Sequence, residues 1–423
     1  MKSLPWHKAS LATKSASPLT AKALQAWLAH LSDQHDGCLL ILLPDATPLR
    51  IGQPSADALQ AQVHLHDYQA LQRLLNGGLV GWAEAYMQGE WTSPDLVSLI
   101  RWGVRNQAAI EAWAHGRTWV RLINRVLHKM RANTKEGSRR NIAYHYDLGN
   151  DFYRLWLDAS MTYSSAFRAH SEQTLAQAQQ HKYQQIAKTL GIQPGDTVLE
   201  IGCGWGGFAE VAAAEFGAQV TGITLSKAQF DYAQARIQAA DLAEQCQFYL
   251  MDYRDLEGQY DHIVSIEMFE AVGEEHWSTY FQQLKNCLKP QANALLQVIS
   301  LDEVRFARYR KQTDFIQKYI FPGGMLPTKQ SMHTYANAAG LTLKMRQDFG
   351  QDYAWTLAQW RQAFLKAWPH LQTLGFDTNF KRMWLYYLAY CEGGFTESCL
   401  DVSFYLYQHQ QKTCVLNNLS TDG

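Results

Sequence analysis

The stretch TVLEIGCGWGG, residues 197–207, decides the fold of this 423-residue chain. Its first half, TVLEI at 197–201, is an apolar run that predicts a buried strand, and residues 208–216 predict a helix. The glycines between them allow a tight turn and let a ligand approach the main chain closely. The stretch therefore predicts a cofactor site where a strand passes into a helix of an α/β fold.

The sequence on either side alternates in the same way. A helix is predicted at 175–190, before the stretch, and another at 227–240, after the next strand. Further buried strands are predicted at 219–223, 247–250, 262–266 and 294–299. Alternating strands and helices are typical of βαβ units, so residues 145–423 are expected to form one α/β domain.

The glycines fit two kinds of cofactor site. Gly202, Gly204 and Gly207 match the dinucleotide pattern G-x-G-x-x-G, which expects a carboxylate at the end of the second strand. The chain has Thr-Gly-Ile-Thr-Leu-Ser at 221–226 and no acid there, which weakens the dehydrogenase interpretation. An S-adenosylmethionine site instead expects an acid after the third strand, and Asp252 stands at that place. A purely structural turn remains the alternative.

Composition and charge exclude several classes of protein. The 38 Lys and Arg residues against 39 Asp and Glu residues exclude a basic nucleic-acid coat, and we expect no nucleic-acid partner. The seven cysteines are scattered without a C-x-x-C pair, which predicts reduced thiols and no metal site. No secretory signal and no apolar run of membrane-spanning length is visible. A cytoplasmic protein is expected.

The first 116 residues predict a small α/β module. A helical pattern near Leu24 precedes strand-like runs at 38–43 and 49–51 and an alternating pattern at 61–65. His64 shares a strand face with His66, but exposed polar alternation explains the pair better than a metal site does.

A basic amphipathic helix is predicted within residues 117–144, between the two domains. Arg117, Arg121, Arg125 and Lys129 recur every four residues, and apolar side chains occupy the opposite face. This pattern is typical of a helix that lies on an anionic membrane surface, and a packed surface helix is the alternative.

From residue 141 onward the chain resembles the cyclopropane-fatty-acid synthase family, which includes the mycolic-acid cyclopropane synthases. The resemblance implies a Rossmann-like class I methyltransferase domain with a seven-stranded, mostly parallel sheet, the cofactor S-adenosylmethionine, and a homodimer. Plant amine N-methyltransferases of the coclaurine type share many of the same blocks. The matching blocks are HYDLGNDFYRLWLD (145–158), MTYSSAF (161–167), VLEIGCGWGGFA (198–209), GITLSKAQ (222–229), DYRDL (252–256), IVSIEMFEAVG (263–273), KYIFPGGMLP (318–327) and DYAWTL (352–357).

The resemblance also implies which residues contact the cofactor. They lie in the block before the 175–190 helix, in the glycine turn, and after the second, third and fourth strands of the domain. They are Tyr163, Ser164, Gly202, Gly204, Gly206, Thr224, Gln229, Asp252, Tyr253, Arg254 and Ile266.

In the family a sulfonium methyl group adds to a cis alkene of a lipid chain, and a base then removes a proton from the resulting carbocation. The family's base is a bicarbonate ion, held by Glu, His, Cys, Tyr and a backbone group. Glu270, Tyr353 and the backbone of Ile299 match that set, whereas Ser165 replaces the Cys and Gln297 replaces the His. Ser and Gln can still hold an anion by hydrogen bonds.

Two further departures bear on the reaction. Ala271 replaces a His that amine methyltransferases are thought to use, which counts against N-methylation. Glu267 is an extra carboxylate where several lipid-acting members carry Gly. An inward Glu267 can serve as a base or shift the pKa of Glu270, and an outward, salt-bridging side chain is the alternative.

The aromatic residues of the C-terminal helical stretch admit two interpretations. They can line an acyl tunnel or belong to an ordinary core, and the core interpretation is favoured. They are Trp355, Trp360, Trp368, Trp384, Tyr386, Tyr387 and Tyr390.

The sequence as a whole predicts C-methyl transfer to unsaturated acyl chains of membrane phospholipids, with cyclopropane formation as the leading reaction. A first rival ends in a methyl-branched or methylene product, and a second is a small-amine N-methyltransferase. A third is a non-catalytic lipid-binding protein, against which the intact Glu270 and Tyr353 argue.

Overall fold

The computed structural model describes residues 36–53, 58–113, 135, 137–138 and 148–409. The chain divides into two compact units, one of residues 1–121 and 378–386, the other of residues 122–377 and 387–423. The helix predicted near Leu24 and nearly all of the basic 117–144 segment lie outside the described residues. The three-part division at 116 and 144 therefore stays a prediction.

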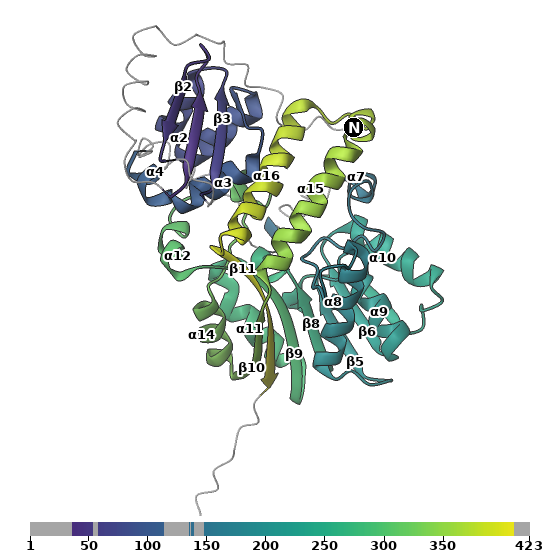
Figure 1. The fold of residues 1–423 in the computed structure, drawn as a ribbon. Coiled ribbons are helices and arrows are strands. Elements are labelled where there is room, and N and C mark those ends of the chain that lie inside the picture. The colour runs from purple at the N-terminus through teal and green to yellow at the C-terminus, as the bar shows by residue number, and fades with distance from the viewer. Residues whose placement is uncertain (1–35, 54–57, 114–134, 136, 139–147, 410–423) are drawn as a thin grey trace, which may run out of the picture. The chain divides into compact units, whose positions relative to one another are not determined.

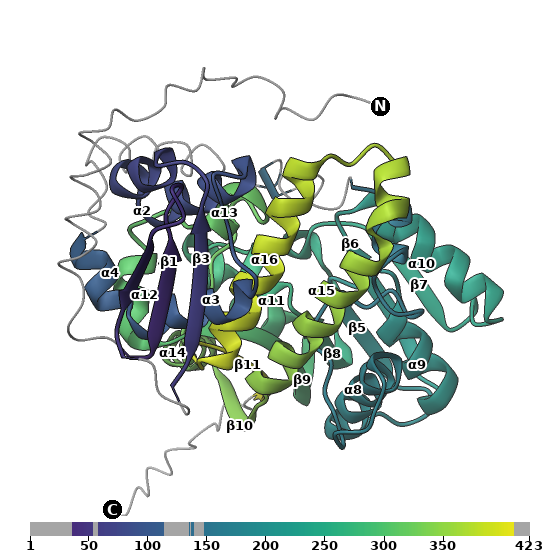
Figure 2. The ribbon, with the colours of Figure 1, turned by 45° about the horizontal axis from the view of Figure 1, so that its top comes forward.

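The first unit contains a four-stranded sheet in the order β2-β1-β3-β4. Strand β1 pairs in parallel with β3 and antiparallel with β2, and α3 packs against β1 and β3 (Figure 2). His64 and His66 have polar neighbours, the amide of Gln62 at 2.6 Å and the hydroxyl of Thr92 at 2.8 Å. The elements are β1 (Cys38–Leu42), β2 (Pro48–Ile51), β3 (Gln60–Leu65), α2 (Gln69–Gln88), β4 (Trp91–Thr92), α3 (Leu96–Arg105) and α4 (Gln107–Trp113).

The second unit contains a seven-stranded sheet in the order β10-β11-β9-β8-β5-β6-β7. In this sheet β11 pairs antiparallel with both β9 and β10, and the other described strand pairs are parallel, which confirms the predicted mostly parallel architecture. The strands are β5 (Thr197–Ile201), β6 (Gln219–Thr224), β7 (Cys246–Leu250), β8 (Tyr260–Ile266), β9 (Leu288–Leu301), β10 (Leu341–Asp348) and β11 (Leu400–His409).

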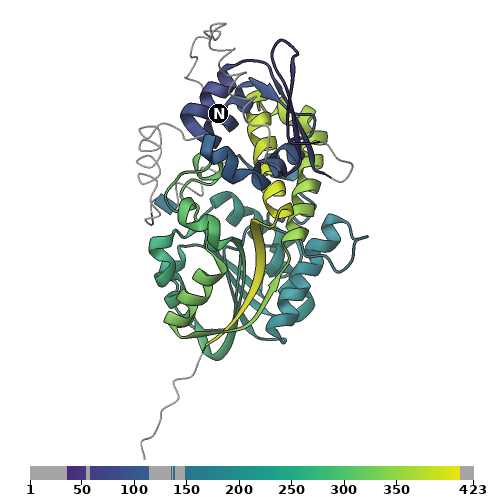
Figure 3. The same ribbon diagram turned by 60° about the vertical axis from the view of Figure 1, so that its left-hand side comes forward.

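Helices cover both faces of this sheet, as Figure 3 shows in a view close to edge-on. Helix α9 packs against α8 and α10, and α11 packs against α14 (Figure 1). Thr174 begins α8 with a capping box in which Gln177 bonds back to it. The helices are α7 (Asn150–Arg154), α8 (Leu175–Leu190), α9 (Gly207–Phe216), α10 (Lys227–Ala239), α11 (Trp277–Asn286), α12 (Glu303–Tyr309), α13 (Phe315–Tyr319), α14 (Lys329–Ala339), α15 (Gly350–Thr373) and α16 (Thr378–Thr396), whose first residues belong to the first unit.

The sheet and its helices bury a continuous apolar core. Leu199, Ile263 and Leu296 from three neighbouring strands pack with Trp277 and Phe281 of α11, all fully buried. Burial of such side chains contributes roughly 1.5–3 kcal/mol each. Because parallel strands share a direction, the ends of β5, β6, β7 and β8 meet at one edge, which is where ligands bind in such sheets.

The aromatic residues of the C-terminal stretch are mostly buried within α15 and α16. Trp360, Trp384, Tyr386 and Tyr387 are at most 5% exposed, in agreement with the core interpretation. No helix in the described part of the chain is long and apolar enough to cross a membrane.

Candidate active site

The glycine turn after β5 has the backbone that the sequence predicts. Gly202, Gly204 and Gly206 all have positive φ, at 86°, 52° and 82°, a region that side chains other than glycine's rarely adopt. A Cβ added at Gly204 would meet no atom within 4 Å, whereas one at Gly202 would lie 2.8 Å from Cγ of Met268. The turn therefore leaves open space against the main chain at Gly204, which fits the approach of S-adenosylmethionine.

Two of the predicted cofactor contacts, Thr224 and Gln229, come together at the end of β6. The hydroxyl of Thr224 donates to Oε1 of Gln229 at 2.9 Å and accepts from the backbone N–H of Ser226 at 3.1 Å. Both Thr224 and Gln229 are 5% exposed. Their hydrogen bonds fix the start of α10 beside the cofactor edge.

Three further predicted cofactor contacts, Asp252, Tyr253 and Arg254, follow β7. The carboxylate of Asp252 accepts from the Arg254 guanidinium at 2.8 and 2.7 Å, so its oxygens are already engaged. Burial alone would raise the pKa of Asp252, but the hydrogen bonds and charge of Arg254 hold it below its usual value. Tyr253 packs against Tyr280 at 5.3 Å between ring centroids, and Ile266 ends β8 at the same edge.

The segment before α8 carries two further predicted cofactor contacts. The hydroxyl oxygens of Tyr163 and Tyr387 lie 2.8 Å apart, and the Tyr163 ring lies 5.2 Å from Trp360. The Ser164 hydroxyl accepts from Nζ of Lys182 at 2.6 Å, and its carbonyl accepts from the Gln179 amide at 2.9 Å. Helix α8 thus holds this segment through the side chains of Gln179 and Lys182.

Glu267 points inward. Its Oε1 accepts from the backbone N–H of Ser165 at 2.8 Å and from the Gln297 amide at 2.7 Å, and its Oε2 accepts from the Tyr353 hydroxyl at 2.7 Å. We call these three donors the Glu267 cradle. They exclude the outward, salt-bridging alternative. Ser165 takes part through its backbone, because its hydroxyl donates to the carbonyl of Ala166 at 2.8 Å.

Glu270 lies one turn further along the chain and, like Glu267, is partly buried. Its Oε1 accepts from the backbone N–H of Ile299 at 2.6 Å, and its Oε2 has no hydrogen-bond partner within the described residues. Burial, and then the charge of Glu267, raises the pKa of Glu270 to about 8. Glu270 is therefore mostly protonated at neutral pH, as like-charge coupling to an inward Glu267 predicts.

The groups implied to hold bicarbonate are used by these two carboxylates. Ser165, Gln297 and Tyr353 donate to Glu267, and Ile299 donates to Glu270. A bicarbonate ion bound by the same donors would lie next to the carboxyl groups of Glu267 and Glu270. The arrangement thus does not fit a bound bicarbonate.

Lys182 and Gln179 were not among the predicted site residues. Both are fully buried, and both contact Ser164. A sequence signal exists, since Ala178, Lys182 and Ile186 recur at helical spacing and place the lysine on the apolar face of α8.

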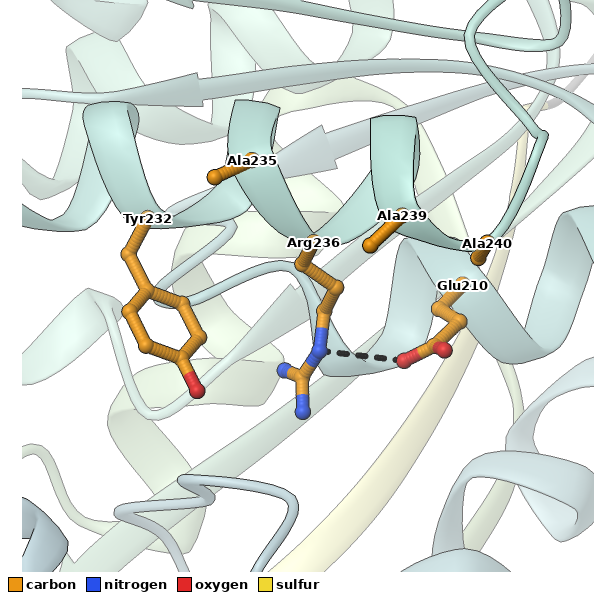
Figure 4. A pocket seen from close by; sticks show the side chains of 6 residues that line it. All are labelled: Glu210, Tyr232, Ala235, Arg236, Ala239 and Ala240. Atoms are coloured by element: carbon orange, nitrogen blue, oxygen red, sulfur yellow. Dashed lines mark ion pairs between the residues drawn. The ribbon is translucent and has the colours of Figure 1, made fainter.

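A surface pocket lies elsewhere, on the outer side of α9 and α10, and none of the predicted site residues lines it (Figure 4). Arg236 pairs there with Glu210 at 3.0 Å and donates to the carbonyl of Trp205 at 3.0 Å. These contacts brace the glycine turn from outside.

Comparisons with known proteins agree with this geometry. A family model described as mycolic acid cyclopropane synthetase matches residues 133–405. The chain is 38% identical to tuberculostearic acid methyltransferase of Mycobacterium tuberculosis, over 86% of each chain. It is 35% identical to cyclopropane-fatty-acyl-phospholipid synthase of Escherichia coli, over 79% of this chain and 84% of that one.

Solved structures also match the second unit's fold. A mycolic acid cyclopropane synthase complexed with SAH and CTAB is similar with a TM-score of 0.60 and 32% identity, over 64% of this chain and 98% of that one. SAH is the demethylated form of S-adenosylmethionine, so that structure was solved with the cofactor's product in place.

Proposed function

Because the chain belongs to the mycolic acid cyclopropane synthetase family of S-adenosylmethionine-dependent methyltransferases, we propose that it methylates the double bond of an unsaturated acyl chain in a membrane phospholipid. The observation that carries this proposal is the inward-pointing, partly buried Glu267 carboxylate in its cradle of three donors. Such a carboxylate, held by three donors, is a fixed proton acceptor.

S-adenosylmethionine supplies an electrophilic methyl group from its sulfonium centre. Once a methyl group has added to an alkene, the neighbouring carbon carries a positive charge, and a proton must leave to give a neutral product. Glu267 accepts that proton, while Tyr353, Gln297 and the Ser165 N–H hold its oxygens in place. The positive charge itself also favours an ionised carboxylate beside it.

Glu270 supports Glu267 without duplicating it. With a pKa of about 8, Glu270 is neutral at pH 7, so the pair carries one negative charge. Its Oε1 is fixed by Ile299, and this contact prevents the side chain from turning away. Both carboxyl groups are thereby available, one as proton acceptor and the other as a hydrogen-bond donor through its proton.

Two products follow from the same carbocation. Loss of a proton from the added methyl group, with closure of a C–C bond, gives a cyclopropane. If a hydride first shifts to the cationic carbon, loss of a proton from the added methyl group gives a methylene group. A separate reductant must then supply a hydride, and the solvent a proton, to convert the methylene group into a methyl branch. In this proposal Glu267 replaces the family's bicarbonate ion as the base. This change of base is the reason to include the methylene or methyl-branched product alongside the cyclopropane. Relatives named for each product support both.

The proposed substrate lies in a bilayer, so the enzyme must dock on it. The basic residues Arg117, Arg121 and Arg125 belong to a segment outside the described residues, and their spacing supports docking on an anionic surface. We propose a cytoplasmic enzyme that associates peripherally with the membrane and acts as a homodimer.

The test is an assay on purified protein with vesicles of monounsaturated phospholipid and, as control, vesicles of fully saturated phospholipid. With unlabelled S-adenosylmethionine, mass spectrometry should find a gain of about 14 daltons, located in the acyl chain, only in the unsaturated lipid. With methyl-labelled S-adenosylmethionine, the label should be found at the same place. Glu267→Gln should lower the rate by about 10² or more. A label found on a head-group amine, or on a small amine in a parallel assay, would contradict the proposal.

A further inference from the structure

Lys182 is a fully buried lysine in the middle of α8, at 0% exposure. Its Nζ donates to the hydroxyl of Ser164 at 2.6 Å and to the carbonyl of Ser165 at 2.9 Å. Removing an ammonium group from water costs several kcal/mol unless charges and hydrogen bonds compensate it. Two of the residues that compensate the ammonium group, Ser164 and Ser165, belong to the candidate active site.

Ser165 links the lysine to the proposed proton acceptor. Its carbonyl accepts from Lys182, and its N–H donates to Glu267 at 2.8 Å. Ser165 is therefore held at its carbonyl by the buried Lys182 and at its N–H by the Glu267 carboxylate. Ser164, the neighbouring residue, is a predicted cofactor contact and also accepts from Lys182.

We propose that Lys182 is a positioning residue that holds the Tyr163–Ser165 segment in place and keeps the Glu267 carboxylate negatively charged. This inference rests on the proposed function, because it assumes that Glu267 accepts the proton. It assigns the lysine a role through Ser164, Ser165 and the charge of Glu267, without contact with substrate.

The titratable groups around Lys182 and Glu267 lie on β5 and α15 and in the loops that follow α7 and β8. Glu267, Asp158 and Glu200 act on the lysine, and burial lowers its pKa to about 7 against their charges. Burial raises the pKa of Glu267, and the charge of Lys182 is the largest effect that opposes this rise. An ionised Glu270 places a like charge near Glu267. The Tyr353 hydroxyl donates to Glu267. Removing the single cation of this group must therefore raise the pKa of Glu267 further.

Gln179 provides a matched control. It lies one turn before Lys182, is also fully buried, and donates to the carbonyl of Ser164 at 2.9 Å. It holds the same segment but carries no charge. Gln179→Met thus removes a buried hydrogen bond to the segment, whereas Lys182→Met removes hydrogen bonds and a positive charge.

The experiment compares the pH dependence of kcat/KM for acyl methylation in wild type, Lys182→Met and Gln179→Met. A base must be deprotonated to act, so activity rises with pH through the pKa of Glu267. We expect the acidic limb to move to higher pH by at least about one unit in Lys182→Met and to stay in place in Gln179→Met. Two results would overturn the claim that the charge of Lys182 keeps Glu267 ionised. One is an acidic limb at the same pH in wild type and Lys182→Met, and the other is an equal shift of the limb in Lys182→Met and Gln179→Met.

Two further measurements complete the test. Calorimetry should show SAH binding at least about tenfold weaker in Lys182→Met, and unchanged affinity would overturn the positioning role. Where circular dichroism shows that Lys182→Met is unfolded, Lys182→Gln replaces it, since Gln keeps a donor but no charge and should give the same limb shift. A wild type that methylates no acyl chain would contradict the proposed function itself, a result distinct from unshifted limbs in an active enzyme.

Discussion

At the scale of single residues, Glu267 has a backbone that a glycine would adopt more easily. Its φ is 50°, in the left-handed region, where a side chain costs roughly 1–2 kcal/mol. The carboxylate that this backbone places in the cradle accepts three hydrogen bonds. A strained residue that is fully engaged at a cofactor edge indicates function, because the fold gains nothing from the strain itself.

Glu270 should make stability depend on pH. Its pKa is about 8 in the folded protein against an ordinary value of 4.5, so the stabilisation is complete below about 4.5 and is lost as pH rises through about 8. Glu270→Gln keeps an oxygen for the Ile299 N–H and does not titrate. We therefore expect the Tm of wild type to fall relative to the Tm of this variant as the pH rises from 5 to 9. The underlying loss in the free energy of unfolding is roughly 1.4 kcal/mol for each unit by which the pKa of Glu270 differs between the folded and the unfolded protein.

Scanning calorimetry of the two proteins across that pH range measures the effect, with Glu274→Gln as control, since Glu274 pairs with Arg310 at the surface. A constant difference in Tm between wild type and Glu270→Gln would show that Glu270 is ionised throughout.

Sequence reasoning predicted part of the candidate site, but it missed Lys182, Gln179 and several of the contacts. Glu267, Gln297 and Tyr353 were predicted, and the structure brings them together. Whether Glu267 points inward depended on packing against β9 and α15, which no local pattern specifies. Ser165 was predicted through its hydroxyl and acts through its N–H, because backbone direction in a loop is set by the contacts on both sides.

At the scale of elements, the glycine turn between β5 and α9 is the part of the fold to which we assign S-adenosylmethionine binding. Gly204 and Gly191 form a matched pair, since both have positive φ and neither Cβ would meet an atom within 4 Å. Gly204→Val and Gly191→Val should therefore lose similar amounts of stability through backbone strain. Only Gly204→Val should lose affinity for S-adenosylmethionine, by at least about tenfold in calorimetry. Equal affinity in the two variants would contradict the cofactor assignment.

The elements of the sheet were largely predictable where periodicity is strong. The helix predicted at 175–190 and the strand predicted at 197–201 have those limits in α8 and β5, since capping and a continuous apolar run specify them locally. Strands β10 and β11 were not predicted. Their pairing joins residues 341–348 to 400–409 across two long helices, so it depends on contacts distant in sequence.

At the scale of the whole molecule, an enzyme that methylates membrane phospholipids must reach a bilayer. Changing Arg117, Arg121 and Arg125 to Glu should abolish binding to anionic vesicles at low salt, and wild-type binding should weaken as salt rises. Vesicle co-sedimentation measures both effects. The control changes three exposed lysines of the second unit to Glu, which gives the same change in net charge and should leave binding nearly intact: Lys188, Lys344 and Lys366. Unchanged binding in the arginine variant would show that this segment is not the docking surface.

The measurement that tests the central claim most directly is acyl methylation by Glu267→Gly, with bicarbonate present and depleted. Wild type should be indifferent to bicarbonate, because Glu267 fills the cradle. Glu267→Gly suits the backbone at φ 50° and leaves the cradle donors open to a small anion. We expect this variant to lose activity by about 10² or more without bicarbonate and to regain part of it when bicarbonate is added. Full activity of Glu267→Gly in bicarbonate-depleted buffer would contradict the claim that the Glu267 carboxylate accepts the proton.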